Sequence, residues 1–268
     1  RGVLPVMRSA LLNVMVQAAT KAGRSLVKDF GEVENLQVSE KGPGDFVSHA
    51  DIKAERVLRA ELLKTRPEYG FLGEEGSEIK GDGRNRWIVD PLDGTTNFLH
   101  AIPHFAVNIA LERDGQIVAA VTYNPITHDT FWAEKGRGAW LQTQRLRVSG
   151  RRDLNDCLIA TGIPFAGAGD PAEWMKIYGA LAPQVAGIRR FGAASLDLAW
   201  VAAGRYDGFW ESDLAPWDTA AGCLLVREAG GFVTDFRGRS QPVCDTQVLA
   251  ANDGLHSKLH KELAAALK

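Results

Sequence analysis

Between residues 87 and 97 the chain contains the stretch WIVDPLDGTTN, in which an apolar run leads directly into two acidic residues. Trp87–Val89 predicts a short strand that delivers Asp90 at its end. Asp93-Gly94 predicts a tight turn, after which a threonine caps a short helix. Carboxylate oxygens suit a hard cation, and the free N–H groups of the turn and helix start suit a phosphate. A capped turn with two solvated aspartates is the alternative.

Two further segments place acids in comparable positions. Glu74 follows the apolar run 69–72 at the predicted end of a strand, so it can project from the same sheet edge as Asp90. Asp218 falls in the first turn of a predicted helix, where the helix macrodipole favours an acid without any further role. The small residues Ala220–Gly222 allow close packing, which would hold Asp218 rigidly, as a metal ligand requires.

Composition excludes several classes of protein. The 268-residue chain is 45% hydrophobic and carries 33 acidic against 31 basic residues, a formal charge of -2. That balance argues against a general nucleic-acid binder, which has a basic excess. Three widely spaced cysteines without a CxxC pair argue against a disulfide scaffold or a zinc site. No apolar stretch reaches the roughly 20 residues that span a bilayer, so we expect no membrane insertion and a cytoplasmic protein.

The pattern of predicted elements changes near residue 150. Before it, two helices at about 6–29 and 50–64 precede several strands, among them a hairpin that turns at Asp114-Gly115, which predicts a largely antiparallel sheet. After it, strands and helices alternate, which predicts a mixed sheet. The strands are expected at 157–161, 206–210, 232–234 and 248–251, and the helices at 171–181, 195–203, 216–229 and 254–267.

We therefore expect two subdomains. The N-terminal α+β subdomain, residues 1–150, would hold most of the metal ligands. The C-terminal α/β subdomain, residues 151–268, would contribute Asp218 and the substrate contacts.

Three motifs together resemble the signature of the inositol monophosphatase family, namely Gly73-Glu74-Glu75, Asp90-Pro91-Leu92-Asp93-Gly94-Thr95-Thr96 and Trp217-Asp218-Thr219-Ala220-Ala221-Gly222. They occur in the family's order and with similar separations, and the resemblance covers nearly the whole chain. It implies a layered αβαβα sandwich and magnesium-dependent hydrolysis of a phosphate monoester by an activated water. It also implies inhibition by lithium, a homodimer, and myo-inositol monophosphate as the favoured substrate.

The resemblance implies a set of metal ligands. These are Glu74, Asp90, Leu92 through its carbonyl, Asp93, Asp218 and Asp51. Two or three magnesium ions are expected, with manganese as a substitute. Asp90 would bridge two of the ions, and Asp51 would help to hold a third, weaker one through water.

The same resemblance implies catalytic and substrate-binding roles. Glu74 and Thr95 would position the attacking water, and Asp93 joins them as a catalytic residue. The substrate contacts would be Gly94, Thr95, Gly192, Ala194, Glu211 and Asp218. A loop lysine, Lys41, matches a position near the metals.

Other functions stay open at this point. Proteins similar to this family also act on fructose 1,6-bisphosphate, histidinol phosphate or 3'-phosphoadenosine nucleotides. Another phosphatase class uses an Asp-x-Asp-Gly-Thr loop with a nucleophilic aspartate, but here the acids are three apart, and on a strand such odd spacing turns the second side chain to the other face. A protein- or RNA-binding module is the non-enzymatic alternative. Its basic residues would be Arg145, Arg147, Arg151, Arg152, Arg189 and Arg190, for which solvated surface is the simpler interpretation.

Overall fold

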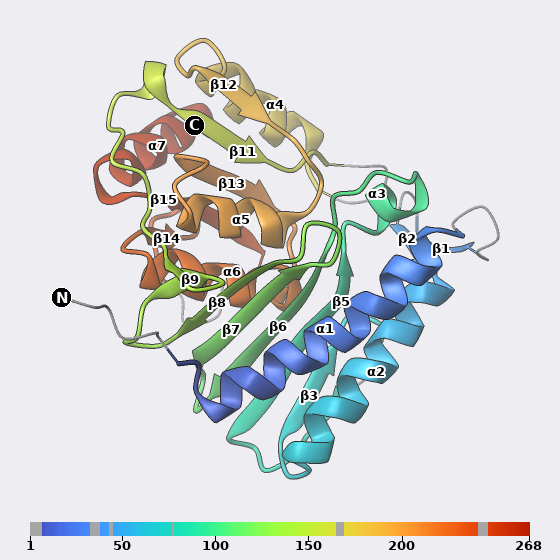
Figure 1. The fold of residues 1–268 in the computed structure, drawn as a ribbon. Coiled ribbons are helices and arrows are strands. Elements are labelled where there is room, and N and C mark those ends of the chain that lie inside the picture. The colour runs from blue at the N-terminus through green and yellow to red at the C-terminus, as the bar shows by residue number, and fades with distance from the viewer. Residues whose placement is uncertain (1–6, 33–37, 43–44, 77, 165–168, 241–245) are drawn as a thin grey trace.

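The computed structural model describes residues 7–268 except 33–37, 43–44, 77, 165–168 and 241–245, and describes only the backbone of 38–42 and 45–48. Its elements stack in five layers, helix, sheet, helix, sheet, helix (Figure 1). This arrangement confirms the expected layered αβαβα sandwich. None of the described helices is both long and apolar enough to cross a membrane.

The first layer is a pair of helices packed side by side, α1 (Ala10–Phe30) and α2 (His49–Thr65). Ser9 caps α1 by accepting a hydrogen bond from the Leu12 amide at 3.2 Å. The buried face of α1 repeats at helical spacing, and it consists of Leu12, Met15, Ala18, Ala19, Ala22, Gly23 and Leu26. That spacing predicted the helix, although its expected start at residue 6 lies outside the described residues.

The second layer is an eight-stranded sheet with the order β10-β9-β8-β7-β6-β5-β3-β4. Every neighbouring pair is antiparallel except β3 and β5, which are parallel. The strands are β3 (Gly70–Gly73), β4 (Glu78–Ile79), β5 (Asn85–Asp93), β6 (Ala106–Arg113), β7 (Gln116–Asn124), β8 (Asp129–Glu134), β9 (Ala139–Leu141) and β10 (Gln144–Arg145). The largely antiparallel sheet and its β6–β7 hairpin are therefore confirmed.

The other three layers come from residues 158–268. Helices α5 (Ala194–Ala202) and α6 (Pro216–Glu228) lie between the sheets. In the five-stranded sheet, β11 is parallel to β12 and β13, and β15 is antiparallel to β13 and β14, as expected of a mixed sheet. Helices α4 (Pro171–Leu181) and α7 (Asp253–Ala266) cover its outer face. The strands are β11 (Leu158–Thr161), β12 (Gly187–Arg189), β13 (Gly208–Ser212), β14 (Phe232–Thr234) and β15 (Gln247–Ala251).

Several short elements were not predicted. One of them is a two-stranded antiparallel ribbon of β1 (Val38–Gly42) and β2 (Asp45–Ser48). The three residues of β12 and the two each of β4 and β10 are too few to show a period in the sequence. The division into subdomains at residue 150 stays a prediction.

Candidate active site

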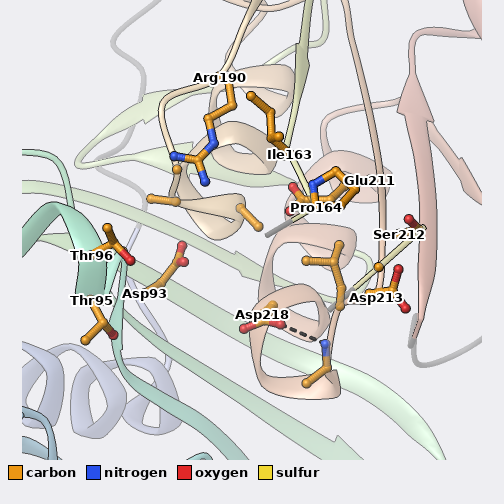
Figure 2. A pocket seen from close by; sticks show the side chains of 18 of the residues that line it. Asp93, Thr95, Thr96, Ile163, Pro164, Arg190, Glu211, Ser212, Asp213 and Asp218 are labelled. Atoms are coloured by element: carbon orange, nitrogen blue, oxygen red, sulfur yellow. Dashed lines mark hydrogen bonds between the residues drawn. The ribbon is translucent and has the colours of Figure 1, made fainter. Parts of the chain in front are cut away.

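Strand ends from both sheets meet at one pocket of about 440 Å³ (Figure 2). Because β3 and β5 run parallel, Glu74 and Asp93 emerge at the same edge of the first sheet. The sequence predicted this edge for Glu74 and Asp90, but β5 continues through Asp90 and ends at Asp93. In the second sheet β11, β12 and β13 also run parallel, and each contributes pocket residues at or just beyond its carboxyl end. Ligand sites commonly form at such edges.

A β-bulge aligns two of the acids. Asp90 pairs with Asn108 and Asp93 with Ala106, so β5 contains one residue more than β6 over this interval. The extra residue cancels the odd spacing, and both carboxylates face the same side of the sheet. That side faces α6, because the Asn108 amide donates to the Trp217 carbonyl at 2.7 Å. The expectation that the spacing turns the acids to opposite faces is therefore wrong.

Asp90 is buried, with 1% of its surface exposed. Burial raises its pKa well above the usual range, and the negative charges of Glu74, Asp93, Asp218 and Asp51 raise the pKa further. The Leu92 amide donates a hydrogen bond to Asp90 Oδ1 at 2.9 Å. Carboxylates crowded in this way require protons or a bound cation to coexist.

Asp93 is held by a residue that the sequence did not single out. Both the amide and the hydroxyl of Ser195 donate to Asp93 Oδ2, at 2.8 and 2.5 Å. Burial raises the pKa of Asp93 to about 6, and the hydrogen bonds from the start of α5 oppose that rise. Ser195 thus ties the N-terminal end of α5 to the end of β5. Only the fold brings these residues together, since they are 102 positions apart.

Asp218 lies in the first turn of α6, as predicted. Its carboxylate accepts a hydrogen bond from the Ala215 amide at 2.7 Å, which fixes its direction. The small residues that follow allow the predicted close packing, because a Cβ at Gly222 would lie 2.5 Å from the Leu198 Cβ on α5. Burial raises the pKa of Asp218 well above the usual range, with Glu74 and Asp93 adding to the effect.

The turn after β5 differs from the prediction in its cap. Gly94, with φ of 94°, is the N-cap of the short helix α3 (Thr95–Leu99), and neither Thr95 nor Thr96 caps it. The Thr95 hydroxyl instead contacts two predicted metal ligands, the Leu92 carbonyl at 3.0 Å and the Asp51 carboxylate at 3.3 Å. Gly94 and Thr95 both line the pocket, whereas Leu92 is buried beneath it.

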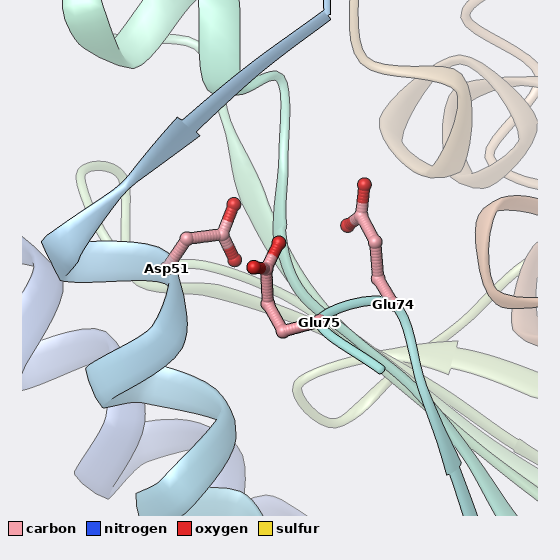
Figure 3. Close-up of side chains that lie close together, drawn as sticks. All are labelled: Asp51, Glu74 and Glu75. Atoms are coloured by element: carbon pink, nitrogen blue, oxygen red, sulfur yellow. The ribbon is translucent and has the colours of Figure 1, made fainter. Parts of the chain in front are cut away.

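Asp51, on α2, lies close to Glu74 and Glu75, which follow β3, and the three form an acidic group (Figure 3). Each offers an oxygen atom within 4.8 Å of the others, a separation that a shared cation can bridge. The sequence analysis gave ligand roles to Asp51 and Glu74 and none to Glu75. The signal for Glu75 was present in the paired glutamates, but its direction depends on the fold, in which its amide donates to the buried Glu55 at 2.8 Å.

The predicted substrate contacts Gly192, Ala194 and Glu211 line the far wall of the pocket. The pKa of Glu211 is raised to about 8, chiefly by burial and in addition by the charge of Asp93, while Arg190 and the Gly162 amide act in the opposite direction. Gly162 has no side chain, and a Cβ there would overlap the Glu211 carboxylate. Lys41 lies in β1, and its side chain falls outside the described residues.

The basic residues proposed for nucleic-acid binding have other contacts. Arg151 pairs with the buried Asp207 at 3.2 Å, and Arg145 stacks on the Trp140 ring. Arg190 is exposed and also lines the pocket, a position that the sequence did not predict. All six arginines are exposed, as expected of solvated surface.

Comparison with known proteins agrees with this site. The profile of the inositol monophosphatase family matches residues 7–268. An inositol-1-monophosphatase of Rhizobium meliloti is 60% identical over 95% of this chain and 96% of its own. A Nus factor SuhB of Pseudomonas aeruginosa is 45% identical over 90% of this chain and 91% of its own. The crystal structure of extragenic suppressor protein suhB from Bartonella henselae superposes with a TM-score of 0.92 at 57% identity, covering 95% of this chain and 98% of that one.

Fold and site thus define a phosphatase hydrolase whose acids are suited to holding metal ions. The chain belongs to the inositol monophosphatase family.

Proposed function

We propose that this chain hydrolyses myo-inositol monophosphate in a magnesium-dependent reaction at the acidic pocket. The observation that carries the proposal is the burial of several carboxylates against one another, with Asp90 at the centre. Ionised carboxylates this close together repel one another, and bound divalent cations would offset that repulsion. When bound, magnesium supplies a Lewis acid that activates water and offsets the charge of the phosphate.

The ligands would be those that the family resemblance implies. They are Glu74, Asp90, the Leu92 carbonyl, Asp93 and Asp218 for two ions, with Asp51 for a third. Their donor set consists of oxygen atoms alone, which suits magnesium or manganese. The contact from Thr95 to Leu92 and Asp51 supports a site in which these groups act together.

The remaining roles follow from position in the pocket. Thr95 and Glu74 would orient the attacking water, and the backbone amides of Gly94 and Thr95 would hold the phosphate oxygens. Glu211 would accept a hydrogen bond from a substrate hydroxyl, which favours a polyol such as inositol. The predicted homodimer, the cytoplasmic location and inhibition by lithium belong to the same proposal.

Amide substitutions test the acids directly. Glu74→Gln or Asp93→Asn should lower kcat by about 100-fold or more at saturating magnesium, because each removes a negative charge that would hold the cation, and the cation would stabilise the anionic transition state. Glu78→Gln, which changes an exposed acid on β4, is the matched control and should keep wild-type activity. Circular dichroism checks that each variant is folded. Near-normal rates in folded Glu74→Gln and Asp93→Asn would rule out the proposed roles.

Substrate choice is a separate measurement. We expect kcat/KM to be highest for myo-inositol monophosphate in a panel with fructose 1,6-bisphosphate, histidinol phosphate and 3'-phosphoadenosine nucleotides.

A role in transcript control is the second candidate, supported by the name of the Pseudomonas relative. Salt-dependent RNA binding that persists in Asp93→Asn would support that role independently of hydrolysis.

A further inference from the structure

Arg190 places a cation on the wall of an otherwise acidic pocket. It directly follows β12, on the loop that leads into α5. Among the described residues that line the pocket, Arg190 is the only lysine, arginine or histidine. Figure 2 shows its guanidinium directed toward the space between Asp93 and Glu211, across the pocket from Asp218. A guanidinium in this place would contact the part of a bound substrate that extends away from the acids.

The loop around Arg190 is held in position. The side-chain amide of Asn97, from α3, donates to the Phe191 carbonyl at 2.7 Å, and the Gly192 carbonyl lies 3.4 Å from the same nitrogen. Gly192 has φ of 79°, and a Cβ there would lie 2.9 Å from Arg190 Nη1. The absence of a side chain at this position therefore leaves room for the guanidinium beside the loop.

Arg190 has charged neighbours but no ion pair within the described part of the chain. Its charge lowers the pKa of Glu211 and of the buried Asp197, against the larger opposite effect of burial on both groups. The guanidinium thus keeps its hydrogen-bond donors available toward the pocket. A planar guanidinium with free donors recognises phosphate or carboxylate oxygens, often with two parallel hydrogen bonds.

We infer that Arg190 is a specificity-determining residue that binds a second anionic group, a phosphate or a carboxylate, in those substrates that carry one in addition to the phosphate that is hydrolysed. The inference rests on the proposed function, since it assumes that the scissile phosphate lies at the acids. The pocket would then have two ends that bind anions. Metal ions would bind one anion near Asp90, and the guanidinium of Arg190 would bind the other. A substrate with two anionic groups would use both, whereas a monophosphate of a neutral polyol would use only the first.

The test compares two esters in three variants. The ratio of kcat/KM for fructose 1,6-bisphosphate to kcat/KM for myo-inositol 1-phosphate is measured with magnesium for the wild type, Arg190→Gln and Arg190→Lys. Arg189→Gln is the matched control, because Arg189 is the exposed neighbour that does not line the pocket. We expect the ratio to fall about 10-fold to 100-fold in Arg190→Gln, the range of a lost hydrogen bond to a charged group. Arg190→Lys should retain part of it, and Arg189→Gln should leave it unchanged.

The outcomes separate this inference from the proposed function. A change in the ratio of less than about threefold in Arg190→Gln would overturn the inference, because that range is within ordinary variation of kinetic constants. An equal fall in Arg189→Gln would do the same, since a general field effect would then explain it. If the wild type hydrolyses neither ester, the proposed function fails, and calorimetric affinities of wild type and Arg190→Gln for the two esters then decide the role of Arg190.

Discussion

Asp197 is a buried acid for which the proposed reaction has no use. It lies in the first turn of α5 with 1% of its surface exposed, and its Oδ1 has no hydrogen-bond partner among the described residues. Burial raises its pKa well above the usual range, and the charges of Glu211 and Asp93 raise the pKa further, while Arg190 opposes them. Asp197 is therefore protonated in the native protein at a pH where a solvated aspartate is ionised.

Asp197→Asn should be more stable than wild type, and the difference in free energy of unfolding should grow as pH increases. In the unfolded wild type Asp197 ionises near pH 4, while the native protein keeps its proton, so the unfolded state binds fewer protons and stability falls as pH rises. Asparagine does not titrate. The free energy of unfolding of Asp197→Asn, relative to that of wild type, should therefore increase by about 1 kcal/mol or more between pH 4 and 8. Urea unfolding across this range measures it.

The control for Asp197 is Asp156→Asn, which changes an exposed aspartate. Its free energy of unfolding relative to wild type should not change with pH in the same way. A constant difference between Asp197→Asn and wild type from pH 4 to 8 would show that Asp197 is ionised in the native protein.

The residues that sequence reasoning found and missed differ in one respect. Glu74, Asp90, Asp93 and Asp218 occur in short motifs beside strand ends or helix starts, so local patterns were enough to nominate them. Ser195 and Arg190 act on groups that are distant in the chain, and they lie in the stretch RRFGAAS, which contains no acidic residue. No local period or spacing marks such residues, because their role exists only after the two sheets are stacked.

At the scale of elements, the contact between α5 and α6 positions the site. Both helices are buried between the sheets, and each begins at a predicted site residue or close to one, Ala194 and Asp218. Their approach requires Gly222, whose hydrogen faces Leu198. The sequence predicted both helices to within a few residues, since their lengths and apolar content are clear. It also predicted the close packing, but it did not identify the partner.

Gly222→Ala should therefore be destabilising despite the higher helix propensity of alanine. The new methyl group would lie 2.5 Å from the Leu198 Cβ, and overpacking of a core costs about 1–3 kcal/mol. The helix propensity offsets up to about 1 kcal/mol of that cost. We expect a lower melting temperature together with a lower kcat, because the shift of α6 displaces Asp218.

A second helical glycine supplies the control. Gly179 lies within α4, and a Cβ there meets nothing within 4 Å. Gly179→Ala should stabilise the protein by up to about 1 kcal/mol through helix propensity alone. If both substitutions raise the melting temperature, the contact of Gly222 with Leu198 does not restrain the helices.

At the scale of the whole molecule, the acidic pocket joins the two halves of the chain. Asp90 and Asp93 come from the first sheet, while Asp218 and Glu211 come from the second half, and each raises the pKa of others. Without a bound cation, the native state is thus more stable at a pH where these acids are protonated than at a higher pH where they ionise. A cation that binds them would hold the halves together. The motifs predicted this meeting of distant acids, whereas the bulge in β5 that aligns two of them could not be inferred from a regular strand.

The stability of the metal-free protein should consequently fall as pH rises, and magnesium should counteract the fall. The unfolded carboxyls ionise near pH 4, whereas native Asp93 and Glu211 keep their protons up to pKa values of about 6 and about 8, so stability is lost progressively between pH 4 and 8. Magnesium at 100 times its dissociation constant should add about 2.7 kcal/mol to the free energy of unfolding. Melting temperatures measured at pH 5 and 8, with EDTA or with magnesium, give both effects.

Removing charge from the cluster distinguishes metal binding from a general salt effect. In Asp90→Asn/Asp218→Asn two of the mutually repelling carboxylates are neutral, so the metal-free protein should lose less stability between pH 5 and 8 than wild type does. The same variant lacks two predicted ligands, and magnesium should no longer raise its melting temperature at pH 8. An equal rise in variant and wild type would place the stabilising cations elsewhere on the molecule, and the acids would then have to be protonated in order to coexist.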